Sequence, residues 1–138
     1  MTLRGFATLY GAVFLLAGIA GFIPGLSPEH THPGVAVAGA SRLALGLFPV
    51  NVLHNLVHLL FGLWGLAAAR GEAAARLYAR AVAVIYAVLT IAGLVPGADT
   101  LFGLVPLYGN DIWLHALLAA IAGYAGFVAR PSVRPAAQ

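Results

Sequence analysis

The sequence has no cysteine and no lysine, and charged residues of either sign are scarce. Without cysteine there are no disulfides, no thiolate metal sites and no cysteine nucleophile. Only 8% of the 138 residues are charged, against about 25% in an ordinary soluble domain. The basic residues are all arginines, and they stand at the ends of apolar runs. They do not form a stripe with interleaved aromatics, so we expect no nucleic-acid partner.

Apolar side chains are what the sequence has in excess, at 62% of the residues. One small soluble core would bury far less than this, so we expect lipid to cover the remainder. Four apolar stretches have roughly the 17 to 25 residues needed to cross about 30 Å of hydrocarbon. The sequence therefore predicts one all-α integral membrane domain over residues 1–138, a four-transmembrane-helix bundle. Its helices are expected at residues 6–23, 51–69, 77–95 and 112–129.

The connections between these stretches carry the usual signals of helix ends. Pro24-Gly25 and Pro96-Gly97 end the first and third stretches, because proline cannot continue the hydrogen-bond ladder and glycine accepts a chain reversal. Residues 70–72 form the turn between the second and third. Residues 34–48 are apolar enough to lie along the membrane surface or to form a re-entrant piece, and residues 130–138 are expected to be a short cytoplasmic tail.

Arginine placement predicts the orientation in the membrane. Six of the seven arginines fall on one side of the predicted spans, and only Arg42 falls on the other. Because basic residues favour the cytoplasmic side, we expect both termini in the cytoplasm. The six on the cytoplasmic side are Arg4, Arg70, Arg76, Arg80, Arg130 and Arg134.

The two halves of the chain resemble each other. Residues 46–58 align without a gap over residues 103–115, with glycine, leucine, proline and a final histidine in register. This similarity favours two tandem two-helix repeats of equal orientation, related by a pseudo-two-fold axis along the membrane normal. The alternative is that small apolar helices are alike by composition alone.

Polar residues inside these apolar stretches are the candidate site. His54 and His58 stand four residues apart on one face of the second stretch, and Asp111 and His115 do the same in the fourth. Both helices run inward from the outer side, so we expect these four side chains to meet near the outer face of the membrane. Ionisable residues in hydrocarbon are costly, at roughly 2.5 to 3.5 kcal/mol for a central Asp, and are usually functional.

Three imidazoles and one carboxylate predict a divalent metal site. The set suits Zn²⁺ first and is acceptable to Fe²⁺, Mn²⁺, Cu²⁺ or Ni²⁺. Four ligands would close the site as a structural one, whereas three would leave a position for water and permit hydrolytic chemistry, so that a metal-dependent membrane hydrolase is the first enzyme to consider. Polar neighbours are expected to orient the ligands from a second layer, namely Asn51, Asn55, Asn110, Trp113 and Arg42.

Two other interpretations of the same residues stay open. One is a metal-free hydrogen-bond network that locks the second helix to the fourth, with Asp111 paired to a histidine or to Arg42 and with Asn51 and Asn110 as helix caps. The other is a haem, quinone or proton-handling role. His30 and His32 are expected to be solvated loop residues, with auxiliary metal binding at the surface as the alternative.

The strings around residues 46–59 and 110–115 resemble those of a bacterial tetraspan family known as domain of unknown function four-three-eight-three. The resemblance covers nearly the whole chain and implies a small plasma-membrane protein, with no activity to carry over. It adds weight to the four His and Asp residues without naming their chemistry. We expect lipid as the main partner and leave open a homo-oligomer or a larger membrane complex.

Overall fold

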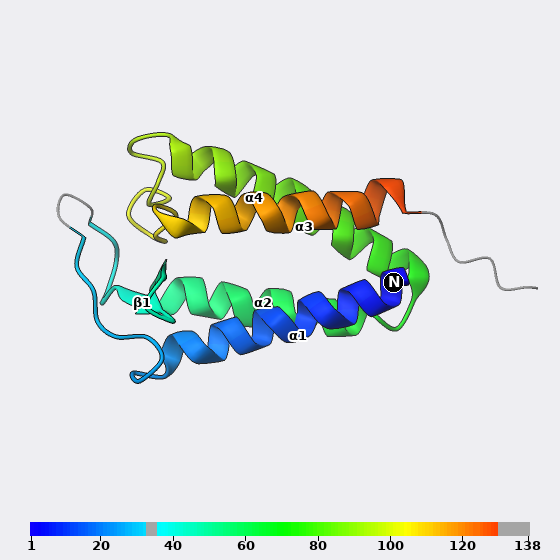
Figure 1. The fold of residues 1–138 in the computed structure, drawn as a ribbon, viewed down its shortest axis with the longest axis horizontal. Coiled ribbons are helices and arrows are strands. Elements are labelled where there is room, and N and C mark those ends of the chain that lie inside the picture. The colour runs from blue at the N-terminus through cyan, green and yellow to red at the C-terminus, as the bar shows by residue number, and fades with distance from the viewer. Residues whose placement is uncertain (33–35, 130–138) are drawn as a thin grey trace, which may run out of the picture.

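The structure is a computed structural model that describes residues 1–32 and 36–129. The chain is mostly helical, as predicted, and has four α-helices with a short β-hairpin between the first two (Figure 1). The tail at 130–138, with Arg130 and Arg134, lies outside the described residues. The elements in order are α1 (Leu3–Phe22), β1 (Arg42–Ala44), β2 (Phe48–Val50), α2 (Val52–Ala68), α3 (Glu72–Leu94), α4 (Asn110–Gly123) and the π-helical turn η1 (Tyr124–Val128).

Three of the helices are long and apolar enough to cross a membrane. They are Leu3–Phe22, Glu72–Leu94 and the continuous run Asn110–Val128, which joins α4 and η1. The fourth, α2, is also apolar but has only 17 residues. Large apolar side chains cover the outside of the bundle, with Leu16 66% and Leu60 65% exposed. Such a surface indicates a membrane protein.

The helices pack as two pairs, α1 against α2 and α3 against α4 (Figure 1). The first pair approaches closely because small residues face each other. A Cβ added to Gly11 would lie 2.8 Å from the Leu66 nitrogen and 2.9 Å from the Gly62 oxygen. Between the pairs lies an aromatic core made of Phe6, Tyr10, Phe14, Tyr78 and Tyr86.

α3 begins at Glu72 rather than at Leu77, where the apolar stretch begins. The residues between them are mainly alanines with Glu72 in the first turn, and both features favour a helix start. Hydropathy marks the part of a helix that suits lipid and does not mark where the helix itself begins.

The segment predicted as interfacial or re-entrant contains an antiparallel hairpin. Arg42 pairs with Val50 and Ala44 with Phe48, and the turn has Leu45 and Gly46 at positive φ, 54° and 69°. Of residues 34–48, the described part is 36–48. The hairpin lies at one end of the bundle, here called the hairpin end, together with the loop that connects α3 to α4 (Figure 1).

The opposite end of the bundle, where the N-terminus lies, is here called the arginine end after the arginines that bond to carbonyls there (Figure 1). There, Arg4 Nε donates to the Ala69 carbonyl at 2.8 Å and Arg80 Nε to the Gly126 carbonyl at 3.0 Å. Arg76 donates to the carbonyl of Gly126 and to that of Ala129, both at 3.1 Å. These bonds satisfy carbonyls that the last turn of a helix leaves free.

Candidate metal centre

His54 lies in the first turn of α2, where Asn51 caps the helix. The Asn51 side-chain oxygen accepts a hydrogen bond of 2.9 Å from the His54 nitrogen, the cap role predicted for it. Its Nδ2 donates to the Ala38 carbonyl at 3.1 Å and to the Leu104 carbonyl at 2.7 Å. One buried amide therefore ties the start of α2 to both loops of the hairpin end and holds His54 in place.

Asp111 lies in the first turn of α4 and His115 one turn further along the same face. Asn110 is the first residue of this helix, and Gly109 stands at the cap position. The Asn110 Nδ2 donates to the Leu47 carbonyl at 3.1 Å, and its Oδ1 accepts from the Trp113 indole at 3.1 Å. The start of α4 is thereby fastened to the turn of the β-hairpin.

These two helices bring His54, Asp111 and His115 together into a buried group that could hold a metal ion. Each side chain offers one ligand atom, and these atoms all lie within 4.8 Å of one another. The three residues are only 4%, 2% and 2% exposed, respectively. The Nδ1 of His54 lies 3.8 Å from the Oδ2 of Asp111.

Polar atoms in this group and in the neighbouring His58 have no hydrogen-bond partner among the described residues. They are the Nδ1 atoms of His54, His58 and His115 and the Oδ2 of Asp111. A buried polar atom left unpaired costs about 1 to 3 kcal/mol, and clusters of such atoms call for an explanation such as an ion or a water. Imidazole nitrogens and a carboxylate oxygen are donors that Zn²⁺ accepts, so the residues fit a metal.

His58 lies beside this group and is not one of its three members. Its ring centroid is 4.5 Å from that of His54 and 5.7 Å from that of Phe14 on α1. The side chain is half-buried, and its ring forms part of the wall of a cavity described below. The structure therefore places it next to the centre, on the side of α1.

Two residues expected to support the ligands have other surroundings. Asn55 is buried against α1, where its side-chain oxygen occupies the space that a Cβ on Gly21 would take. Arg42 donates to the Ser27 carbonyl at 3.0 Å and forms an ion pair of 3.4 Å with Glu29. Arg42 thus pairs with the carboxylate of Glu29. The imidazole that lies near the Asp111 carboxylate is that of His54.

The sequence matches the family model described as domain of unknown function (DUF4383) over residues 4–128. The chain belongs to this family. The predicted resemblance is confirmed, and the matched range contains all four helices except Leu3, the first residue of α1, together with the whole His/Asp group. A search of curated proteins found no match, and neither did a search of solved structures.

In this DUF4383 chain two cavities flank the centre. One, of about 150 Å³, is lined by His58, Asp111 and His115 together with apolar side chains of α1, α4 and the hairpin. The other, also about 150 Å³, lies toward α3 and is lined by His54, His58 and His115 with apolar residues. The centre therefore lies in apolar surroundings with free space on two sides.

Aromatic rings hold His115 and His58 in the DUF4383 chain, a role that the sequence interpretation missed. Tyr86 of α3 packs edge-on against His115 with ring centroids 5.0 Å apart, and it also contacts Phe14 at 5.4 Å. Only the packing of α3 against α4 shows that Tyr86 reaches the centre.

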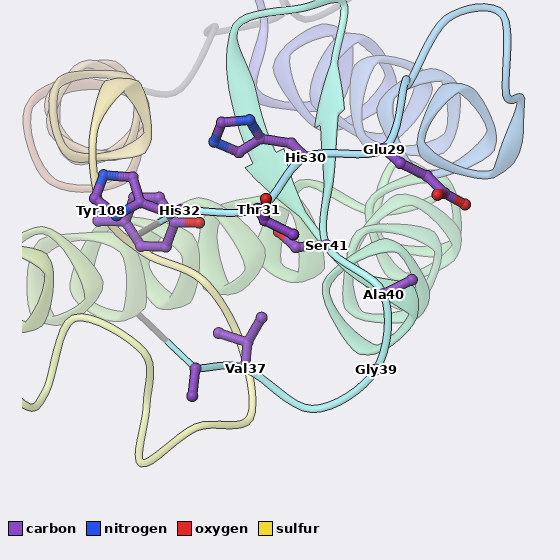
Figure 2. Close-up of a pocket in the computed structure, with 10 residues that line it drawn as sticks. Glu29, His30, Thr31, His32, Val37, Gly39, Ala40, Ser41 and Tyr108 are labelled. Atoms are coloured by element: carbon purple, nitrogen blue, oxygen red, sulfur yellow. The ribbon is translucent and has the colours of Figure 1, made fainter. Parts of the chain in front are cut away.

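His30 and His32 lie in the loop before the hairpin, at a surface pocket of about 250 Å³ that Tyr108 also lines. Figure 2 shows the His32 ring beside Tyr108 while the His30 ring projects in another direction. The His32 and Tyr108 centroids are 4.8 Å apart, whereas those of His30 and His32 are 6.4 Å apart. Neither histidine is among the three residues of the buried group.

Proposed function

We propose that this protein binds one divalent transition-metal ion, Zn²⁺ in the first place, through His54, Asp111 and His115. The observation that carries the proposal is the convergence of three buried ligand atoms within 4.8 Å of one another. Tetrahedral ligands about 2.0 to 2.2 Å from Zn²⁺ stand roughly 3.3 to 3.6 Å apart, so small side-chain rotations suffice to close the site.

The donor set narrows the choice of metal. Two imidazoles and one carboxylate hold the catalytic Zn²⁺ of some hydrolases, and the same set holds non-haem Fe²⁺ in oxygenases. Zn²⁺ stands above Fe²⁺ in the general order of affinity for such ligands. Three protein ligands leave a fourth position for water, and bound Zn²⁺ makes that water acidic. Hydrolysis is therefore the first reaction to screen.

A metal-free lock between α2 and α4 is the competing account. Such a lock works through hydrogen bonds, which for nitrogen and oxygen need about 2.7 to 3.2 Å. The distance from His54 Nδ1 to Asp111 Oδ2 is 3.8 Å, and both atoms lack a partner among the described residues. These features favour an ion between the side chains.

The proposed setting is a bacterial plasma membrane crossed by all four helices, with both termini in the cytoplasm. At a rise of 1.5 Å per residue, the 17 residues of α2 extend about 25 Å. α2 runs antiparallel alongside α1, with Gly11 near Gly62 and Gly18 near Asn55, so it crosses the same depth. The arginine end faces the cytoplasm under the positive-inside rule, which puts the metal centre near the outer face.

The experiment that tests the proposal is elemental analysis of the detergent-purified protein. The protein is first dialysed against a buffer that contains divalent metal ions in trace amounts. We expect about one zinc per chain in the wild type. Asp111→Asn keeps the size of the side chain and removes a ligand oxygen, so it should lose the metal. His30→Ala, a histidine outside the buried group, is the matched control and should keep it. Metal-free wild-type protein that remains fully stable would support the lock instead.

A further inference from the structure

The cavity beside the metal centre lies between α1 and α4, and exposed apolar side chains border it. The Tyr10 hydroxyl donates to the Leu118 carbonyl at 3.2 Å and joins the two helices there. Toward the hairpin end from this bond, Val13 and Ala17 of α1 and Leu114 of α4 line the cavity. Leu45 of the hairpin turn lines it at the hairpin end. Val13 and Leu45 are 47% and 62% exposed, so the rim of the opening is apolar and faces the surroundings of the bundle.

The interior of the same cavity is different in character. Its polar residues are His58, Asp111 and His115, and each has a buried side-chain atom with no hydrogen-bond partner among the described residues. Two of them are members of the proposed metal centre, and His58 stands beside it. The cavity thus has an apolar opening toward the lipid and a polar floor. The buried polar atoms of that floor lack hydrogen-bond partners among the described residues.

From this arrangement we propose that the centre receives its ligand from the lipid phase, and that the ligand is a single-chain amphiphile with a carboxylate head, that is, a fatty acid. The inference rests on the proposed metal site, because a divalent ion held by one carboxylate keeps a net positive charge that attracts an anionic oxygen. The head occupies the open metal position beside His58. The chain leaves between α1 and α4 into the hydrocarbon.

Size and depth agree with this class of ligand. A cavity of about 150 Å³ holds a carboxylate and the first carbons of a chain, whereas whole drug-sized ligands need roughly 300 to 1,000 Å³. His54 and Asp111 lie in the first turns of α2 and α4, at the hairpin end. In the membrane setting proposed above, this end lies close to the lipid headgroups. A head held there keeps its chain within the outer half of the bilayer.

Photo-crosslinking tests the inference. Zinc-loaded protein in lipid nanodiscs is irradiated with hexadecanoic acid that carries a diazirine near its carboxyl end, and the labelled residues are mapped by mass spectrometry. We expect label on the rim residues Val13, Ala17 and Leu114, competed by unlabelled hexadecanoic acid and not by hexadecanol. Ala17→Trp fills the opening and should abolish the label while one zinc per chain remains. Leu9→Trp, at an exposed α1 position outside the cavity, is the control and should keep both.

The outcomes separate this inference from the metal proposal. Label spread evenly over exposed α1 residues such as Leu9, or unchanged in Ala17→Trp, overturns the lateral opening even if zinc is bound. Equal competition by hexadecanol overturns the carboxylate head. A wild type without metal that is still labelled at the rim contradicts the metal proposal and the metal-held head together. If Ala17→Trp fails to fold, as judged by its zinc content, Ala20→Trp fills the same cavity and replaces it.

Discussion

The Nδ1 of His54 lies 3.8 Å from the Oδ2 of Asp111, and each atom is buried without a hydrogen-bond partner among the described residues. The two side chains come from different helix pairs, α1 with α2 and α3 with α4, so they face each other across the contact between the pairs. His115 adds a third ligand atom from the α4 side. An ion bound here would join the two halves of the molecule. Its loss would lower the stability of the fold and also remove the chemistry of the site.

Stability should therefore depend on metal. Binding to the folded state alone adds about 2.7 kcal/mol to the free energy of unfolding at a free metal concentration of 100 times Kd. We expect the wild type in detergent to gain about this much when zinc is titrated in and to lose it with a chelator. Asp111→Asn should show no such dependence. The measurement is the unfolding midpoint as a function of the free zinc concentration. A wild-type midpoint that does not change with zinc contradicts the account.

His58 should behave differently from the three ligands. Because it lies outside the group of atoms within 4.8 Å of one another, His58→Ala should retain about one zinc per chain. We expect its zinc affinity to fall less than that of Asp111→Asn, within the roughly 10- to 100-fold range typical of residues that support a ligand. Competition with a chelating dye gives both affinities. Complete loss of zinc in His58→Ala would make it a ligand and the site a four-residue one.

The close approach of α1 and α2 gives a prediction about glycine. A Cβ at Gly11 would lie 2.8 Å from the Leu66 nitrogen, and backbone cannot move aside as a flexible side chain can. Gly11→Ala should destabilise the protein by about 1 to 3 kcal/mol, as overpacking usually does. Gly25→Ala, where nothing lies within 4 Å of the added carbon, should leave the unfolding midpoint unchanged. Equal midpoints for the two variants would mean that the helices are further apart than described.

Orientation can be tested on the natural sequence, because it contains no cysteine. A single cysteine at Asp99, in the loop of the hairpin end, should react with a membrane-impermeant maleimide in intact cells or spheroplasts. A cysteine at Gly71, in the turn of the arginine end, should react only after permeabilisation. The unchanged chain serves as the blank. Reversed labelling of the two variants would place the metal centre on the cytoplasmic side.

The helices and the convergence of His54, Asp111 and His115 could be predicted from the sequence, and each prediction has a physical reason. Long apolar runs have few other stable conformations, and a spacing of four residues puts Asp111 and His115 on one face of any helix. The same spacing does not fix where a neighbouring helix stands around that face. This is why His58, four residues after His54, lies next to the centre and outside the group of three.

The features that the sequence did not predict depend on long-range contacts. Residues 42–50 show no alternation of polar and apolar side chains, so nothing local indicates the hairpin that Arg42 and Val50 close. The bond from Asn110 to the Leu47 carbonyl and the packing of Asn55 against Gly21 arise only when distant segments meet. Tyr86 reaches His115 for the same reason.

X-ray absorption at the zinc edge tests the central claim most directly. On protein loaded with one equivalent of zinc, the account predicts nitrogen and oxygen neighbours at about 2.0 to 2.1 Å with the outer-shell scattering of two imidazoles. In His115→Ala that outer-shell signal should fall to one imidazole, while His30→Ala should keep both. A spectrum of zinc surrounded by water oxygens alone, unchanged in His115→Ala, would contradict a metal centre at His54, Asp111 and His115.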